Sequence, residues 1–282
     1  MPDTLIKGYE ELEKKFLERV KDDRDQYNDI VYLPAFLKPT RKVKYVFISM
    51  EPSLTEKWAD PPHRNKAEAA IEGGFRNFGP GRFEDTILHY CVHKYLPANF
   101  NEYYITDMSK GAMPPQIADE ARRRTWLNWF PLLKKELELV AEEDAQIFAI
   151  GRVVEGFLLG KAPKMKMTAK KDEYMEIVNW IEKHFHGKPK YLPHHAPTNR
   201  GYWPKYIKEK NLVTDYDAYK LTEDTLTEDK LLEFSKTLLS YTHTGKNLKE
   251  FCMKGLGNQK FNDTLIKMGF VYKTILEKKR PG

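Results

Sequence analysis

The amino-acid sequence predicts an α/β protein, a three-layer α/β/α sandwich around a central parallel sheet of four strands, with a helical C-terminal extension. Two observations indicate this class. Short runs of apolar and aromatic residues, bounded by turn residues, recur along the chain as buried strands do. Between these runs, apolar residues recur at three- and four-residue spacing, as in amphipathic helices. Strands that alternate with helices favour a parallel sheet covered on both faces.

Four strands are expected, at residues 43–50, 103–108, 145–151 and 188–194. Helices are expected around them, at residues 4–28, 117–140, 153–160 and 171–186. Prolines and glycines interrupt residues 52–82, after the first strand, so a long irregular loop is expected there. Long irregular segments inside compact domains are often functional, which makes this loop a candidate part of a site.

The strands are expected to stop near residue 212. Beyond it, residues 227–241 and 258–276 have helical patterns. The turns expected to separate the helices of this region lie near Gly245, Gly255 and Gly257. We therefore expect an α/β domain at 1–212 and a basic helical extension at 213–282.

Composition indicates an ordinary globular protein. The 282 residues are 41% hydrophobic and 31% charged, and no apolar run approaches the roughly 20 residues of a membrane span. The first residues lack the pattern of a signal peptide, so we expect a cytoplasmic protein with no membrane contact. Cys91 and Cys252 are the only cysteines, too few for a cysteine-held iron–sulfur cluster or a cysteine-based zinc site. No metal or other cofactor is expected.

The positive charge is concentrated at the C-terminal end. The formal net charge is +6, and residues 242–282 alone hold nine Lys or Arg against three Asp or Glu. This basic end could face a polyanion such as DNA. A solvated lysine-rich surface is the alternative, and the sequence leaves both open.

All four predicted strands end in polar residues. Glu51 follows the first strand, Asp107 lies in the second, Arg152 follows the third, and His194 and His195 end the fourth. Because the carboxyl ends of parallel strands converge on one edge, these groups are expected to share a pocket there. Each alone could be a capping, turn or surface residue. Their combination favours a functional site.

Two of these segments resemble motifs of the uracil-DNA glycosylase superfamily. Residues 49–53, Ser-Met-Glu-Pro-Ser, are similar to its first motif, in the Gly-Met-Asn-Pro-Gly form of the single-strand-selective branch. Residues 194–197, His-His-Ala-Pro, are similar to its His-Pro-Ser-Pro-like last motif, and Arg200-Gly201-Tyr202 to the residues that trail it. The resemblance covers roughly residues 40–212. It implies a base-excising enzyme that acts on DNA.

The resemblance also implies roles for individual residues. Glu51 would orient water and stabilise the oxocarbenium-like sugar, and His194 would donate a hydrogen bond to the base carbonyl oxygen. His195 replaces the first proline of the motif, and it could do this work instead of His194. Either Phe75 or Phe78 would stack on the flipped base. The DNA contacts would come from six residues, Ser53, Lys110, Arg152, Thr198, Asn199 and Arg200.

Asp107 departs from the family pattern in a way that bears on the substrate. Members that excise uracil have an Asn here, whose amide can donate to O4 and accept from N3–H. An ionised Asp107 only accepts, which suits the N4 amino group of cytosine. The favoured substrate is therefore a C5-modified cytosine. Hypermodified phage DNA would make the protein a defence enzyme, whereas uracil or another deaminated base would make it a repair enzyme.

Two other classes of function stay open. The protein could be a catalytically silent, DNA-binding member of the superfamily, although Glu51 and His194 together favour catalysis. It could also be an unrelated nucleotide-handling α/β protein, although the sequence has no Walker A motif and no Rossmann glycine pattern. A monomer is expected in each case.

Overall fold

The computed structural model describes ten segments of the chain, residues 2–25, 30–52, 63–96, 98–113, 119–160, 171–185, 187–195, 201–241, 246–257 and 260–278. These segments contain both helices and strands, and the strands include a parallel sheet, so the α/β class is confirmed. In the same segments, no helix combines the length and apolar character that a membrane span needs.

The central sheet has four parallel strands in the order β3-β2-β5-β6. Their bounds are β2 (Val43–Ser49), β3 (Tyr103–Asp107), β5 (Ala141–Ile150) and β6 (Lys190–Leu192). The four predicted strands are thus confirmed, with small changes at their ends. The fourth is shorter than expected because Pro189 and Pro193 bracket it, and proline has no N–H to give to a sheet. A separate antiparallel pair joins β1 (Val31–Tyr32) and β4 (Gly111–Ala112).

The chain divides into two compact units, and each is described by itself. Unit 1 consists of residues 1–72 and 101–193, and unit 2 of residues 73–100 and 194–282. This division differs from the expected boundary at residue 212, because residues 73–100 and 194–212 cluster with the C-terminal helices. The described elements of residues 213–282 are helices, as expected, but they are part of a larger unit.

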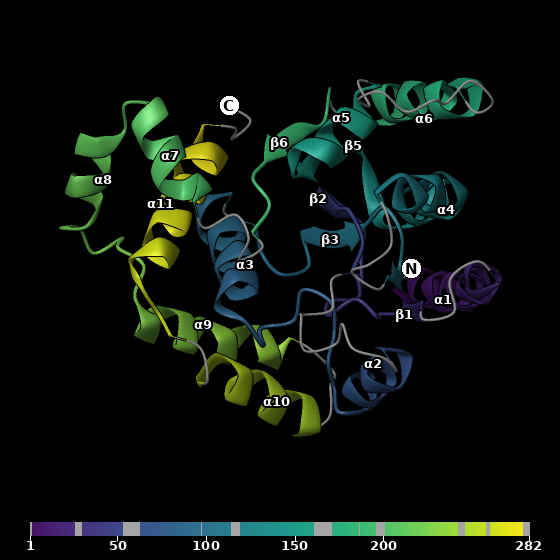
Figure 1. Cartoon of the computed structure of the whole chain (residues 1–282), viewed down its shortest axis with the longest axis horizontal. Helices are drawn as coiled ribbons and strands as arrows, with labels where there is room; N and C mark the ends of the chain where they lie inside the picture. The colour runs from purple at the N-terminus through teal and green to yellow at the C-terminus, as the bar shows by residue number, and fades with distance from the viewer. Residues whose placement is uncertain are drawn as a thin grey trace. The chain divides into compact units, whose positions relative to one another are not determined.

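Unit 1 contains both sheets and five helices among its described residues. The helices are α1 (Pro2–Arg24), α2 (His63–Glu72), α4 (Asp119–Val140), α5 (Arg152–Leu158) and α6 (Lys171–His184). Figure 1 shows α1, α4 and α6 in a row along the central sheet. Val46 and Ile48 of β2 lie in one buried cluster with Leu133 and Leu137 of α4. Burying these apolar faces is the main force that holds the helix on the sheet.

Unit 2 is helical in all of its described elements. They are α3 (Phe83–Tyr95), α7 (Tyr202–Glu209), α8 (Val213–Tyr219), α9 (Glu228–Ser240), α10 (Lys246–Gly257) and α11 (Asp263–Glu277). The helix α11 packs against α3, α7 and α8, and α9 packs against α3 and α10 (Figure 1). The helix α3 was not predicted from the sequence, and neither was its grouping with α11.

Three local expectations are corrected. The segment 52–82 was expected to be irregular, but its residues 63–72 form α2. Gly255 and Gly257 were expected in turns but lie inside α10. The helix expected from residue 258 begins at Asp263, because Asn262 accepts hydrogen bonds from the N–H groups of Thr264 and Leu265 and so caps α11.

Candidate functional site

The strand order places a topological switch point between β2 and β5. From β2 the chain crosses to β3 on one side, and from β3 it returns to β5 on the other side. In open parallel sheets, ligands bind outside the carboxyl ends of the strands at such a point. Glu51 and Arg152 each follow the last residue of their strand, Ser49 or Ile150, by two positions. Both therefore flank the switch point of the sheet.

The carboxylate of Glu51 is bound at both oxygens by side chains of α4. Arg122 donates from Nη1 to Oε1, and Trp126 donates from Nε1 to Oε2 at 2.7 Å. Arg122 and Trp126 can act together because residues four apart lie on one face of a helix. The Glu51 side chain is only 9% exposed, so the two bonds fix its orientation. A carboxylate has about four acceptor sites, so it can still accept a hydrogen bond from water.

Asp107 ends β3 directly beside the end of β2. It is the register partner of Ser49, and only 1% of Asp107 is exposed. The backbone around it is fixed, because Met108 N–H donates to Ser49 O at 2.9 Å and Lys110 Nζ donates to Asp107 O at 2.7 Å. Asp107 and Glu51 thus belong to the same edge of the sheet, as expected.

Lys110 does not occupy the surface position expected of a DNA contact. Its ammonium group lies 2.7 Å from Oε2 of Glu136, which is completely buried, and it donates to Thr106 Oγ1 at 2.5 Å. Tyr104 OH donates to the other oxygen of Glu136 at 2.7 Å, and Tyr9 OH lies 2.6 Å from Tyr104 OH. Because its charge is compensated inside unit 1, Lys110 serves this buried network rather than a phosphate.

Arg152 is placed as a surface residue at the start of α5. Its side chain is 69% exposed, it donates to Glu155 at 2.7 Å, and its guanidinium lies 3.7 Å from the centre of the Tyr191 ring. The preceding Gly151 has a φ of 94°, a left-handed conformation that glycine adopts readily. Arg152 thus lies at the surface against Tyr191 of β6, where an anion can reach it.

In unit 2, a ring nitrogen of His195 contacts the carboxylate of Asp85 in α3. His195 Nε2 lies 2.8 Å from Asp85 Oδ1, and the two side chains are 9% and 14% exposed. Burial raises the pKa of Asp85, but the hydrogen bond and electrostatic interaction with His195, helped by Arg82 and His89, outweigh burial and lower it overall. Asp85 is therefore ionised at neutral pH.

His194 stacks on His195, with ring centres 4.9 Å apart and planes only 2° from parallel. Burial and the electrostatic interaction with His195 lower the pKa of His194 to about 3, against a weaker opposing effect of Asp85. The imidazole of His194 is therefore neutral at physiological pH. A neutral ring can donate one hydrogen bond, which is the role that the family resemblance implies for this residue.

Phe78 packs against the same histidine group. Its ring centre lies 5.6 Å from that of His195, and only 7% of Phe78 is exposed. Its φ of 56° is left-handed, which costs a non-glycine residue about 1–2 kcal/mol. His89 Nε2 lies 2.8 Å from the Phe78 carbonyl oxygen, and this hydrogen bond helps to hold the backbone conformation of Phe78. Phe75 keeps intermediate exposure.

Several predicted contacts fall outside the described residues, namely Ser53, Thr198, Asn199 and Arg200. Four residues of the two groups were missed by sequence reasoning, namely Asp85, His89, Arg122 and Trp126. Both pairs have four-residue helical spacing, which was the available signal. Within the described segments, His, Cys, Asp and Glu side chains form no group of three suited to a metal ion.

Comparison of the chain with protein-family models, with curated proteins and with solved structures finds no match.

Proposed function

We propose that the protein is a DNA glycosylase that flips a modified or damaged base and hydrolyses its N-glycosidic bond, leaving an abasic site. The observation that carries the proposal is the fixed carboxylate of Glu51 at the switch point of the sheet. Breaking the bond between the base and C1′ creates positive charge on the sugar, and a preoriented anion stabilises such charge strongly. Glu51 also orients the water that adds to C1′.

His194 acts on the departing base in this proposal. The electron pair of the broken C1′–N bond leaves with the base, so negative charge develops on its carbonyl oxygen. A neutral imidazole N–H can donate to that oxygen, and the pKa of His194, about 3, keeps the ring neutral. Phe78 is the favoured stacking residue because its ring already packs with the histidine group of unit 2, and Phe75 is the alternative.

Asp107 selects the base in the same proposal. Its carboxylate would accept a hydrogen bond from the N4 amino group of a cytosine, so the favoured substrate is a C5-modified cytosine, in hypermodified phage DNA for instance. An ionised carboxylate would repel O4 of uracil. The deaminated-base repair enzyme remains the alternative within this class.

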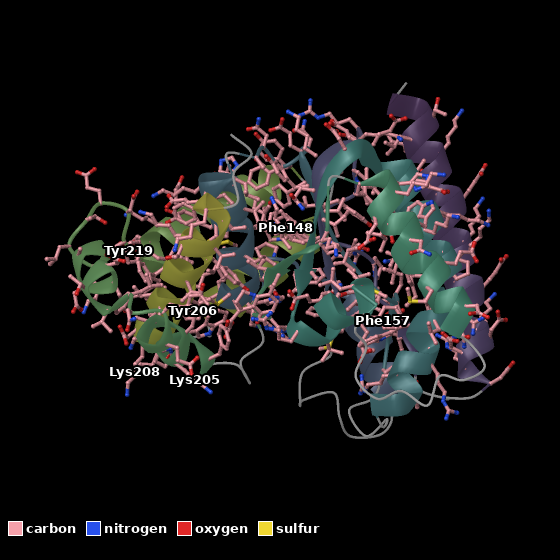
Figure 2. The ribbon with its side chains drawn as sticks, turned by 90° about the horizontal axis from the view of Figure 1, so that it is seen from above. Phe148, Phe157, Lys205, Tyr206, Lys208 and Tyr219 are labelled. Carbon is pink, nitrogen blue, oxygen red and sulfur yellow. The ribbon has the colours of Figure 1, made fainter. Side chains whose placement is uncertain are left out.

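The helix α7 supports the choice of DNA as the partner. Lys205 and Lys208 are exposed on it, and Figure 2 shows both beside Tyr206 at the outer edge of the protein. Lysines next to an aromatic ring suit a nucleic acid backbone and its bases. The same observation favours the second candidate, a DNA-binding protein without catalysis. We include in the proposal the three-layer α/β/α arrangement, the monomeric state and the cytoplasmic location that the sequence predicts.

The proposal is tested by incubating the protein with duplex and single-stranded DNA that contains uracil, hypoxanthine, 5-methylcytosine or glucosylated hydroxymethylcytosine. Alkaline cleavage then reports abasic sites. We expect cleavage with a modified cytosine and much less with uracil. DNA binding without abasic sites on any substrate would favour the silent DNA-binding protein instead.

A further inference from the structure

The contact between Asp85 and His195 determines where the histidine carries its proton. Asp85 is ionised, so its oxygen can only accept a hydrogen bond. The contact of 2.8 Å with Nε2 therefore requires a hydrogen on Nε2. In the neutral ring, Nδ1 is then left with a lone pair and can only accept.

Nδ1 of His195 is buried and has no hydrogen-bond partner among the described residues. Three described groups contact the ring. The His194 ring stacks on it, the Phe78 ring packs against it, and Asp85 holds its other nitrogen. His89 and Arg82 are the further charged or titratable neighbours of this pair. A buried acceptor without a partner is unfavourable, and a donor from a ligand would remove that penalty.

We propose that Asp85 is a positioning residue, which holds His195 in the Nε2–H tautomer so that Nδ1 accepts a hydrogen bond from an N–H group of the bound base. The identity of the ligand as a base rests on the proposed function, whereas the tautomer does not. The two adjacent histidines then have opposite tasks. His194 donates to a carbonyl oxygen, and His195 accepts from an amino or ring N–H group.

The tautomer is tested by NMR on the full chain labelled with ¹⁵N-histidine. Long-range ¹H–¹⁵N correlation spectra distinguish protonated from unprotonated ring nitrogens, and His195→Gln assigns the signals. We expect His195 to carry hydrogen on Nε2 alone. In Asp85→Asn the side-chain amide can donate to Nε2, so the hydrogen should move to Nδ1. A doubly protonated ring, or an Nδ1–H tautomer in the wild type, overturns the proposal.

The role in binding the base is tested by excision rates under single-turnover and multiple-turnover conditions. In Asp85→Asn the excision rate should fall about ten- to a hundredfold. Nδ1 would then carry a hydrogen and could no longer accept the N–H group of the base. Asp85→Glu keeps the carboxylate and should recover most of the rate. Asp217→Asn, which removes an exposed ion pair with Lys220, should match the wild type.

The NMR and rate experiments distinguish a failure of the proposed tautomer from a failure of the proposed function. Wild-type excision by Asp85→Asn, with the tautomer unchanged, removes Asp85 from the mechanism. If the wild type excises no base from any DNA, the proposed function fails, but the NMR arm still decides the tautomer. If Asp85→Asn does not fold, the wild-type spectrum and the excision rate of Asp85→Glu decide the proposal. A wild-type His195 ring with its hydrogen on Nδ1 overturns it. An Asp85→Glu variant without measurable excision also overturns it.

Discussion

Glu51 and Lys110 both follow a strand of the same sheet, yet their charges meet different partners. Glu51 pairs with Arg122 near the edge of the sheet, whereas Lys110 turns inward to the fully buried Glu136. The sequence places both residues after a strand, but it does not say which way either side chain points. For Lys110, that direction depends on the carboxylate of Glu136 in α4, and no local sequence pattern encodes it.

Replacing Lys110 with Met should destabilise the protein by about 3–5 kcal/mol, because it leaves the carboxylate of Glu136 buried without its cation. Urea unfolding measures the change. Lys44→Met is the matched control, since Lys44 pairs with Glu102 at 3.1 Å but is 56% exposed. Its loss of stability should be much smaller, because water screens an exposed ion pair. Equal losses for the two variants would contradict the burial argument.

Asp107→Asn should shift the substrate preference from cytosine-type bases toward uracil by about ten- to a hundredfold. The amide restores a donor for O4, and a buried donor–acceptor mismatch costs about 1–3 kcal/mol. Excision rates of both proteins on uracil and on a C5-modified cytosine measure the shift. Efficient uracil excision by the wild type at high pH, where Asp107 is ionised, would contradict this account of base selection.

At the scale of the element, hydrophobic patterns predicted the central strands well, because each is a short apolar run buried in the sheet. They failed where a cap or a close approach decides the structure. Asn262 fixes the start of α11, and Gly255 continues a helix where a turn was expected. The reason for Gly255 is spatial, since a Cβ there would overlap the carbonyl oxygen of Gly81.

Gly255→Ala should therefore destabilise unit 2, by about 1–3 kcal/mol, because the helix must move away from the backbone of Gly81. Thermal unfolding checks the loss. Gly257→Ala is the control in the same helix, since no atom of the described residues lies within 4 Å of a Cβ at that position. It should be neutral or stabilise by up to about 1 kcal/mol, because alanine favours helix more than glycine does. A neutral Gly255→Ala would contradict the close approach.

At the scale of the whole molecule, each candidate residue group was predictable only in part. The order of the strands and polar strand ends indicated Glu51, Asp107 and the two histidines. The sequence did not reveal that residues 73–100 belong with the C-terminal helices. For this reason 242–282 cannot be removed as a separate basic tail. It contains α11, whose buried residues include Leu265, Met268, Phe270, Val271 and Tyr272.

Buried histidines should make the protein sensitive to acid. Burial lowers the pKa of His89 to about 4, whereas an unfolded histidine titrates near 6.5. Between these values the unfolded chain binds more protons, so this stability is complete above about pH 6.5 and is lost as the pH falls toward 4. Urea unfolding at pH 7.5 and pH 5 should differ by about 1–2 kcal/mol. His89→Gln should reduce that difference, and an unchanged difference would contradict the assignment.

The central claim is that the carboxylate of Glu51 acts on the sugar cation, and the most direct test is single-turnover excision by Glu51→Gln beside its DNA affinity. The variant keeps the shape of the side chain and can still bond to Trp126. We expect excision to fall at least about a hundredfold while DNA affinity stays within about threefold, because the anion acts in the transition state and not on the bound ground state. Excision at the wild-type rate by a folded Glu51→Gln protein would contradict the account.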